Sequence, residues 1–384
     1  MPIVRDSIRS VPLMAALVGA LIFTGLVPGC SDRTVDAPSR ESSAHGIFPE
    51  NGAYAGAYID FGLTEDAVTL DTIDEFEKLT GKRMTIVASS SFWGEQTFPT
   101  RNLTIIARHQ ALPLVFWSPW DRPYKEEVGP DRFGLNAILA GVWNDYIDAW
   151  ADAARTHGKP ILVSWGLEMN GCWFPWSGCY YNGATTAADR SMSGPEIYKE
   201  AFRYVVDRVR AKGATNVLWG FHANNFSQPF EPWNTLPAYY PGPEYVDWLG
   251  LSAYGKQAAD DDWLTFHQVF DNAYGELCKL DPLKPVVIAE WGVGEFPQSG
   301  SKAEWFREAF RAIETDYTRV KAAVYWHERW RNADESYSNL RIHSSPEALE
   351  AFRQGVSSPF WKDRLIEPAL SATAGKPPSG RSAP

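Results

Sequence analysis

Two glutamates stand where apolar runs of strand length end. Glu168 lies in the segment 164–171 (Ser-Trp-Gly-Leu-Glu-Met-Asn-Gly), and Glu290 lies in 287–292 (Val-Ile-Ala-Glu-Trp-Gly). An ionised carboxylate buried so deeply costs several kcal/mol unless it is paired or functional. Two convergent carboxyl groups suit the cleavage of a glycosidic bond, because one protonates the leaving oxygen while the other attacks the anomeric carbon or activates water. A structural ion pair is the alternative for either glutamate alone, and it is disfavoured for both together.

Eight apolar runs alternate with helical patterns and indicate how the two glutamates are held. Some runs are continuously apolar, as in 161–163 (Ile-Leu-Val), which is typical of parallel strands buried on both faces. Helical patterns cover 68–79, 136–157 and 193–212, each followed by a glycine. The eight runs are 53–59, 83–88, 113–117, 160–167, 216–221, 246–252, 285–290 and 322–326.

This alternation predicts a single (β/α)8 barrel of the α/β class. Chemistry in that fold sits at the C-terminal ends of the strands, and the fourth and seventh strands face each other across the barrel mouth, so the two glutamates can converge there. A doubly wound open sheet is the alternative, but no glycine-rich phosphate loop follows the first strand.

Composition limits the partners. The net charge of −11 repels phosphate and argues against nucleic acid, and it favours a neutral glycan over an anionic one. The 17 tryptophans exceed what a core requires, so part of them is expected to line a groove. The 7 histidines show no His-Glu-x-x-His spacing, and no paired-cysteine zinc pattern or Gly-x-Ser-x-Gly elbow occurs. We therefore expect no metal and no cofactor.

The ends of the chain predict export. Arg5 and Arg9 precede an apolar run over 11–27, as in a signal peptide, and 26–30 (Leu-Val-Pro-Gly-Cys) resembles a bacterial lipobox that would lipidate Cys30. The expected organisation is a lipoprotein-type signal peptide (1–30), a flexible tether (31–50), the barrel (51–366) and a disordered tail (367–384). We expect a monomeric bacterial lipoprotein anchored to a membrane, with plain secretion as the alternative. A disulfide between Cys172 and Cys179 is plausible in an exported chain.

Four segments carry a family resemblance. Residues 168–176 (Glu-Met-Asn-Gly-Cys-Trp-Phe-Pro-Trp) resemble the acid/base motif of glycoside hydrolase family 26, and 288–292 (Ile-Ala-Glu-Trp-Gly) resemble its nucleophile strand. Residues 240–254 are similar to that family's sixth strand with its lead-in loop, and 341–349 to its closing segment. The resemblance covers about residues 110 to 355.

The resemblance implies roles for individual residues. Glu168 would be the general acid/base and Glu290 the nucleophile of a retaining, endo-acting hydrolase, with their carboxyl groups about 5–5.5 Å apart. Tyr254 would hydrogen-bond the nucleophile, Trp326 would form the floor of the sugar subsite at the cut, and Trp173 would flank the leaving-group side. Asn170 would either bind sugar hydroxyls or cap a turn. Further candidates for substrate binding are Trp120, Trp176 and His222.

The chain departs from the family at two places. Leu167 occupies the position before the acid/base glutamate where a histidine is usual, and 116–120 (Phe-Trp-Ser-Pro-Trp) lacks a histidine that mannan-cleaving members tend to carry. β-1,4-Mannan is the first substrate that the resemblance implies, with mixed-linkage β-glucan and β-xylan as alternatives. A non-catalytic polysaccharide-binding barrel is a further alternative, and transglycosylation would use the same residues as hydrolysis.

Overall fold

The computed structural model describes residues 46–124, 129–181, 193–332 and 334–366. The predicted signal peptide, Cys30 and the tail 367–384 lie outside these residues. Residues 46–50, which we assigned to the tether, pack against the barrel: Phe48 is buried, and the Tyr54 hydroxyl donates to the Ile47 carbonyl at 2.9 Å. The folded body therefore begins before residue 51. None of the described helices is both long and apolar enough to cross a membrane.

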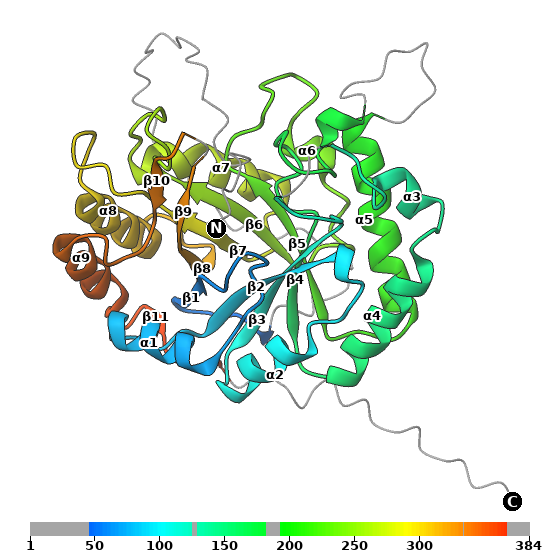
Figure 1. Ribbon diagram of the computed structural model, residues 1–384, viewed down its shortest axis with the longest axis horizontal. Coiled ribbons are helices and arrows are strands. Elements are labelled where there is room, and N and C mark those ends of the chain that lie inside the picture. Colours follow the sequence, from blue (N-terminus) through cyan, green and yellow to red (C-terminus); the bar gives the residue numbers. More distant parts are fainter. Residues whose placement is uncertain (1–45, 125–128, 182–192, 333, 367–384) are drawn as a thin grey trace, which may run out of the picture.

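Eight parallel strands close into a barrel, as predicted. Each strand pairs with the next along the chain, and β8 returns to pair with β1, from Tyr54 opposite Ala322 to Ile59 opposite His327. Figure 1 shows the strands at the centre with the helices around them. The strands are β1 (Ala53–Ile59), β2 (Ile86–Phe92), β3 (Leu112–Ser118), β4 (Ile161–Trp165), β5 (Val217–Asn224), β6 (Trp248–Tyr254), β7 (Val286–Gly292) and β8 (Val320–His327).

Shorter strands and the helices complete the described chain. A two-stranded hairpin of β9 (Arg329–Arg331) and β10 (Tyr337–Asn339) follows β8, and β11 (Trp361–Lys362) adds to β1. The α-helices are α1 (Leu70–Thr80), α2 (Thr100–Arg108), α3 (Leu135–Leu139), α4 (Asn144–His157), α5 (Gly194–Ala211), α6 (Leu236–Tyr239), α7 (Phe266–Leu280), α8 (Lys302–Thr315) and α9 (Pro346–Val356), and the 3-10 helices are η2 (Trp93–Glu95) and η3 (Gly178–Tyr180).

Local chemistry explains where the elements begin and end. Ser193 opens α5 with a capping box that also uses Glu196, and Gly81 closes α1 in the left-handed region at φ 70°. The predicted helix over 136–157 is interrupted, because Gly141 adopts a φ of 78° between α3 and α4. The predicted fourth strand, 160–167, ends at Trp165, since Gly166 turns the chain at a φ of 57°. The second strand lies later than expected and includes the buried serines 89–91.

Most tryptophans belong to the core, so the part of them that can line a groove, as expected from their number, is small. Twelve of the 17 are almost fully buried. Trp117 stacks on Trp150 with ring centroids 4.1 Å apart, and Trp93 packs beside Trp117 at 5.2 Å. Large rings fill the wide space between barrel and helices efficiently, so indole count alone does not indicate a sugar-binding groove.

The closeness of this packing predicts the effect of two glycine substitutions. A Cβ on Gly220 in β5 would lie 2.1 Å from the Trp248 ring, whereas a Cβ on Gly275 in α7 would meet nothing within 4 Å. We expect Gly220→Ala to lower the free energy of unfolding by about 1–3 kcal/mol through overpacking. The control Gly275→Ala should raise it by roughly 0.5–1 kcal/mol, because alanine favours a helix. Thermal unfolding followed by circular dichroism measures both, and equal effects would contradict this account of the barrel packing.

Candidate active site

Glu168 lies in a turn directly after β4. The residue is 5% exposed, and its backbone adopts the left-handed conformation at φ 52°, which is strained for any residue other than glycine. Its backbone N–H donates to the His222 carbonyl at 2.7 Å, which ties the turn to the end of β5. The Trp173 indole N–H donates to the Glu168 carboxylate at 2.7 Å. The carboxyl group is therefore fixed by the backbone and by one aromatic donor.

Glu290 lies inside β7 and is completely buried. The Tyr254 hydroxyl, at the end of β6, donates to its Oε2 at 2.6 Å. A short O–H···O bond to a carboxylate is a charge-assisted bond, which stabilises the negative form. The register of β6 and β7 shifts between Leu251 and Ser252, so that Ser252 lies opposite Glu290. The irregularity accompanies the close approach of the Tyr254 phenol to the Glu290 carboxylate.

A cleft joins the surroundings of the two glutamates. Glu168 and Trp173 form one wall, and Tyr254 with the loop after β6 forms another. Tyr254 both lines the cleft and bonds Glu290, so the second carboxyl group lies directly behind the cleft surface. The empty space of the cleft is about 860 Å³, part of it open to solvent. Its lining consists of Glu168, Trp173, Asn224, Asn225, Phe226, Gln228, Tyr254, Gly255, Lys256, Gln257, Asp261, Asp262 and Leu264.

Asn170 and His222 hold the site together from within, which differs from the sugar-binding roles predicted for them. The Asn170 amide donates to the Asn224 carbonyl at 2.9 Å and to the Ser227 hydroxyl at 3.2 Å, and its oxygen accepts from the Asn224 N–H at 2.8 Å. The side chain is fully buried. It therefore links the Glu168 turn to the loop after β5, the structural alternative that the sequence left open.

His222 is 1% exposed and contacts two serine hydroxyls from the neighbouring strands. Its Nδ1 lies 2.9 Å from the Ser164 Oγ on β4, and its Nε2 lies 2.9 Å from the Ser252 Oγ on β6. The ring thus bridges three strands beneath the cleft. It supports β4, which leads into Glu168, and β6, which carries Tyr254, and it does not line the cleft.

Trp120 and Trp176 are core residues, in contrast to their predicted role in substrate binding. They are 2% and 1% exposed, and the Trp176 indole donates to the Leu167 carbonyl at 2.7 Å. Phe174 stacks on Trp176 with centroids 4.8 Å apart and meets Trp120 edge-on. These rings form a floor under the Glu168 turn. Leu167 itself is buried in the core.

Trp326 is the penultimate residue of β8 and contacts two residues that the sequence analysis missed. Tyr58 from β1 stacks on its ring with centroids 3.9 Å apart, and the Glu328 carboxylate accepts from its indole N–H at 2.8 Å. Glu328 is 3% exposed. The strand-end rule that singled out Glu168 and Glu290 would also have found Glu328, because it follows β8 directly.

Another buried carboxylate missed from the sequence is Glu65, in the loop after β1. It accepts from the Ser90 hydroxyl at 2.6 Å and from the Tyr124 hydroxyl at 3.0 Å. These bonds tie together the loops after β1 and β3 and the strand β2. No apolar run leads directly into Glu65, so the sequence carried no signal for it.

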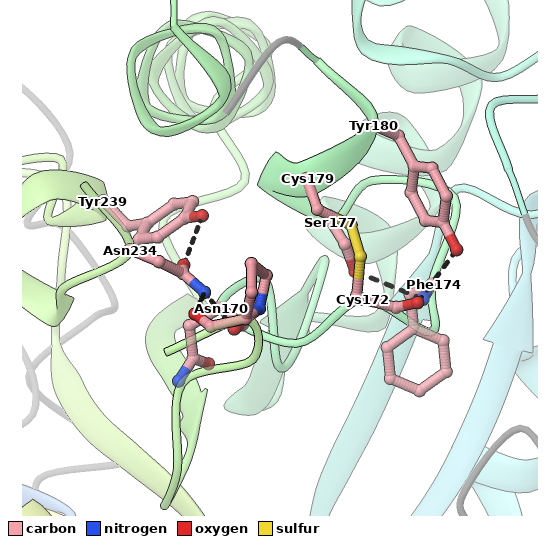
Figure 2. Close-up of a disulfide and its surroundings, with 9 residues drawn as sticks. Asn170, Cys172, Phe174, Ser177, Cys179, Tyr180, Asn234 and Tyr239 are labelled. Carbon is pink, nitrogen blue, oxygen red and sulfur yellow. Dashed lines mark hydrogen bonds between the residues drawn. A yellow bond between two sulfur atoms is a disulfide. The ribbon is translucent and has the colours of Figure 1, made fainter. Parts of the chain in front are cut away.

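A disulfide joins Cys172 and Cys179 in the loop after β4. Figure 2 shows it beside Tyr180, whose hydroxyl donates to the Cys172 carbonyl at 2.8 Å. The Ser177 hydroxyl accepts from the Phe174 N–H at 3.2 Å within the same loop. Trp173 lies inside the closed segment, so the disulfide helps fix the indole that bonds Glu168.

One group among the described residues has the composition of a metal site. Asp74, Glu77 and His109 bring ligand atoms within 4.8 Å of one another. They belong to α1 and to the end of α2, outside the cleft, and the His109 Nε2 already contacts the Glu77 carboxylate at 2.7 Å. We assign this group to packing between the outer helices.

Fold and site together define a class: a (β/α)8 barrel with two buried glutamates, of which Glu168 after β4 lines a cleft and Glu290 on β7 lies behind it. Comparison with known proteins agrees with this class. The model of glycosyl hydrolase family 26 matches residues 135–318. This match supports an assignment of the chain to that family.

Three relatives illustrate the match. Endoglucanase H of Acetivibrio thermocellus is 31% identical over 312 residues, which is 80% of this chain and 31% of that protein. A mannan endo-1,4-β-mannosidase of Bacillus subtilis is 26% identical over 211 residues, 55% of this chain and 49% of that protein. The catalytic domain of an endo-β-1,4-mannanase from Bacillus sp. JAMB-750 shares the fold with a TM-score of 0.59 at 21% identity, covering 84% of this chain and 89% of that one. The chain thus spans a third to a half of the two curated relatives.

Removal of the disulfide should loosen the loop that holds Trp173. We expect the double variant Cys172→Ser/Cys179→Ser to lose about 2–3 kcal/mol of unfolding free energy, because the unfolded chain gains entropy. Calorimetry with and without a phosphine reductant measures the loss. The reductant should lower the melting temperature of the wild type and leave that of the double variant unchanged. A wild type that is insensitive to reduction would contradict a stabilising disulfide.

Proposed function

We propose that the protein is an endo-acting, retaining glycoside hydrolase that cleaves a neutral β-linked polysaccharide. One observation carries the proposal: two buried glutamates, each held by an aromatic donor, lie at one cleft. A binding protein has no use for two buried carboxylates, since each costs free energy to desolvate. The match to family 26 supports the same reaction class.

The surroundings of the glutamates differ in a way that matches two roles. Glu168 lines the cleft and can reach the oxygen of the scissile bond, so it acts as the general acid. Glu290 is buried with a phenol donating to it, which suits an ionised nucleophile. In the first step Glu290 attacks the anomeric carbon while Glu168 protonates the departing oxygen. In the second step Glu168 takes a proton from water, which attacks the same carbon and releases Glu290.

β-1,4-Mannan is the first substrate that we propose, because curated relatives of the family include mannan endo-1,4-β-mannosidases. Mixed-linkage β-glucan is the second, because the relative named Endoglucanase H matches 80% of the chain. The segment 116–120 also favours it, since it lacks the histidine that mannan-cleaving members tend to carry. β-Xylan is the third substrate to test.

We also propose that the chain is exported and lipidated at Cys30, and that it acts as a monomer. The basic and apolar leader and the lipobox-like segment support export and lipidation. Metabolic labelling with a radioactive fatty acid tests the anchor, with Cys30→Ala as the control. Label that persists in Cys30→Ala would contradict it.

The catalytic pair predicts how two substitutions act. Glu168→Gln and Glu290→Gln should each lower reducing-sugar release from the preferred polysaccharide by at least about a hundredfold, because each removes a proton-transfer or nucleophilic group without changing volume. The panel contains mannan, glucomannan, lichenan, β-1,3-xylan and β-1,4-xylan. The exposed Glu276→Gln on α7 is the matched control and should retain the wild-type rate. If the wild type binds a polysaccharide of the panel and cleaves none, the protein is a polysaccharide-binding barrel and the proposed hydrolase is wrong.

Retention predicts the configuration of the first product. Proton NMR of an oligosaccharide digest should show the β-anomer of the new reducing end first, with the α-anomer appearing only by mutarotation. Initial formation of the α-anomer would mean inversion and a wider separation of the two carboxyl groups. The measurement needs no variant and is independent of the identity of the sugar.

A further inference from the structure

The loop between β5 and α6 exposes two phenylalanines. Phe226 is 39% exposed and Phe230 is 97% exposed. Exposed large apolar side chains are scattered singly over the rest of the described surface, whereas these two lie four positions apart in one loop. Exposed apolar side chains that gather in one loop commonly mark a binding surface.

This loop is fixed on both sides of Phe230. Before it, the Asn170 amide donates to the Ser227 hydroxyl, and the Gln228 N–H donates to the Asn170 carbonyl at 2.8 Å. After it, the buried Asn234 amide donates to the carbonyls of Asn170 and Pro229, each at 2.9 Å. Figure 2 shows Asn234 between Asn170 and Tyr239, whose hydroxyl donates to Asn234 at 2.7 Å. The aromatic rings are thus carried by a preorganised loop, which lowers the entropy cost of binding.

The loop continues the catalytic cleft on the side of Glu168. Phe226 and Gln228 line the same cleft as Glu168 and Trp173. The same cleft is lined by Gln257, whose side-chain oxygen is buried and accepts no hydrogen bond from the described residues. An unsatisfied buried acceptor costs free energy, and a ligand hydroxyl would supply the missing donor. Apolar faces beside a hydroxyl acceptor match the C–H faces and hydroxyl rim of a sugar.

We propose that Phe226 and Phe230 form a platform for the polysaccharide chain on the leaving-group side, beyond the sugar that contacts Trp173. The name of that side rests on the proposed function, whereas the binding does not. The exposed Asp262 in the cleft and the net charge of −11 disfavour an anionic polymer or an anionic membrane surface. A neutral glycan is the occupant that fits the charge, the aromatic rings and the free acceptor.

The test measures how binding depends on chain length. In the Glu290→Gln background, calorimetric titration with manno- and gluco-oligosaccharides of two to six units compares Phe226→Ala/Phe230→Ala with the parent. We expect roughly tenfold weaker binding for the longer oligosaccharides and a smaller effect for the shorter ones, since only long chains reach the platform. Phe230→Trp keeps an aromatic face and should keep the affinity. Leu283→Ala removes an exposed apolar side chain just before β7 and should change nothing.

Turnover gives a second measure. In the active enzyme, Phe226→Ala/Phe230→Ala should lower kcat/KM on the polymer roughly tenfold, mainly through a higher KM. The kcat/KM on a short aryl glycoside should change much less. An equal loss for short and long ligands, or loss of a wild-type dimer in size-exclusion chromatography, would overturn the platform. If the wild type cleaves no β-glycan and the length-dependent loss of binding persists, the proposed hydrolysis fails and the platform stands.

Discussion

The cost of burying two carboxylates governs the rest of this molecule. Glu290 is fully buried and Glu168 nearly so, and each has lost most of its contact with water. The structure offsets that cost with one aromatic donor apiece, the Tyr254 phenol and the Trp173 indole. The Trp173 indole comes from the same loop after β4 as Glu168, whereas the Tyr254 phenol on β6 reaches across to Glu290 on β7. The barrel must therefore bring β6 and β7 together before Glu290 is stable in its place, and the loop after β4 must fold back on itself before Glu168 is.

The Glu168 turn shows how much surrounding structure one strained residue requires. A left-handed glutamate costs of the order of 1 kcal/mol or more, and it persists only where its neighbours fix it. Here the His222 carbonyl accepts a hydrogen bond from the Glu168 N–H, and the Trp176 indole donates to the Leu167 carbonyl. The Asn170 amide donates to the Asn224 carbonyl at the end of β5. The disulfide adds a covalent restraint to the loop that carries Trp173. Several polar and aromatic residues near the site thus serve the geometry of one carboxyl group.

The barrel and the two glutamates were predictable, because buried parallel strands leave long apolar runs and a carboxylate at the end of such a run stands out. The roles of Asn170, His222, Trp120 and Trp176 were not predictable. A buried amide and a sugar-binding amide have the same sequence appearance, and only the distances to Asn224 and Ser227 separate them. A buried indole and a sugar-binding indole also look alike in the sequence, because the core between barrel and helices can accommodate many tryptophans. The helix is interrupted at Gly141 by a positive φ angle, which the spacing of apolar residues in the sequence does not reveal.

The proposed chemistry and the proposed choice of substrate are located in different parts of this site. The two carboxylates accept hydrogen bonds from the Trp173 indole and the Tyr254 hydroxyl. Leu167, Asn170 and His222 face inward, so none of them offers a polar group to a sugar. Even the Lys256 ammonium in the cleft donates to the carbonyls of Ala259 and Asp261 of its own loop. In the proposed function, discrimination between sugars therefore falls to the remaining groups of the loops after β5 and β6, such as Gln228, Gln257 and Asp262. Those loops can change without disturbing Glu168 and Glu290.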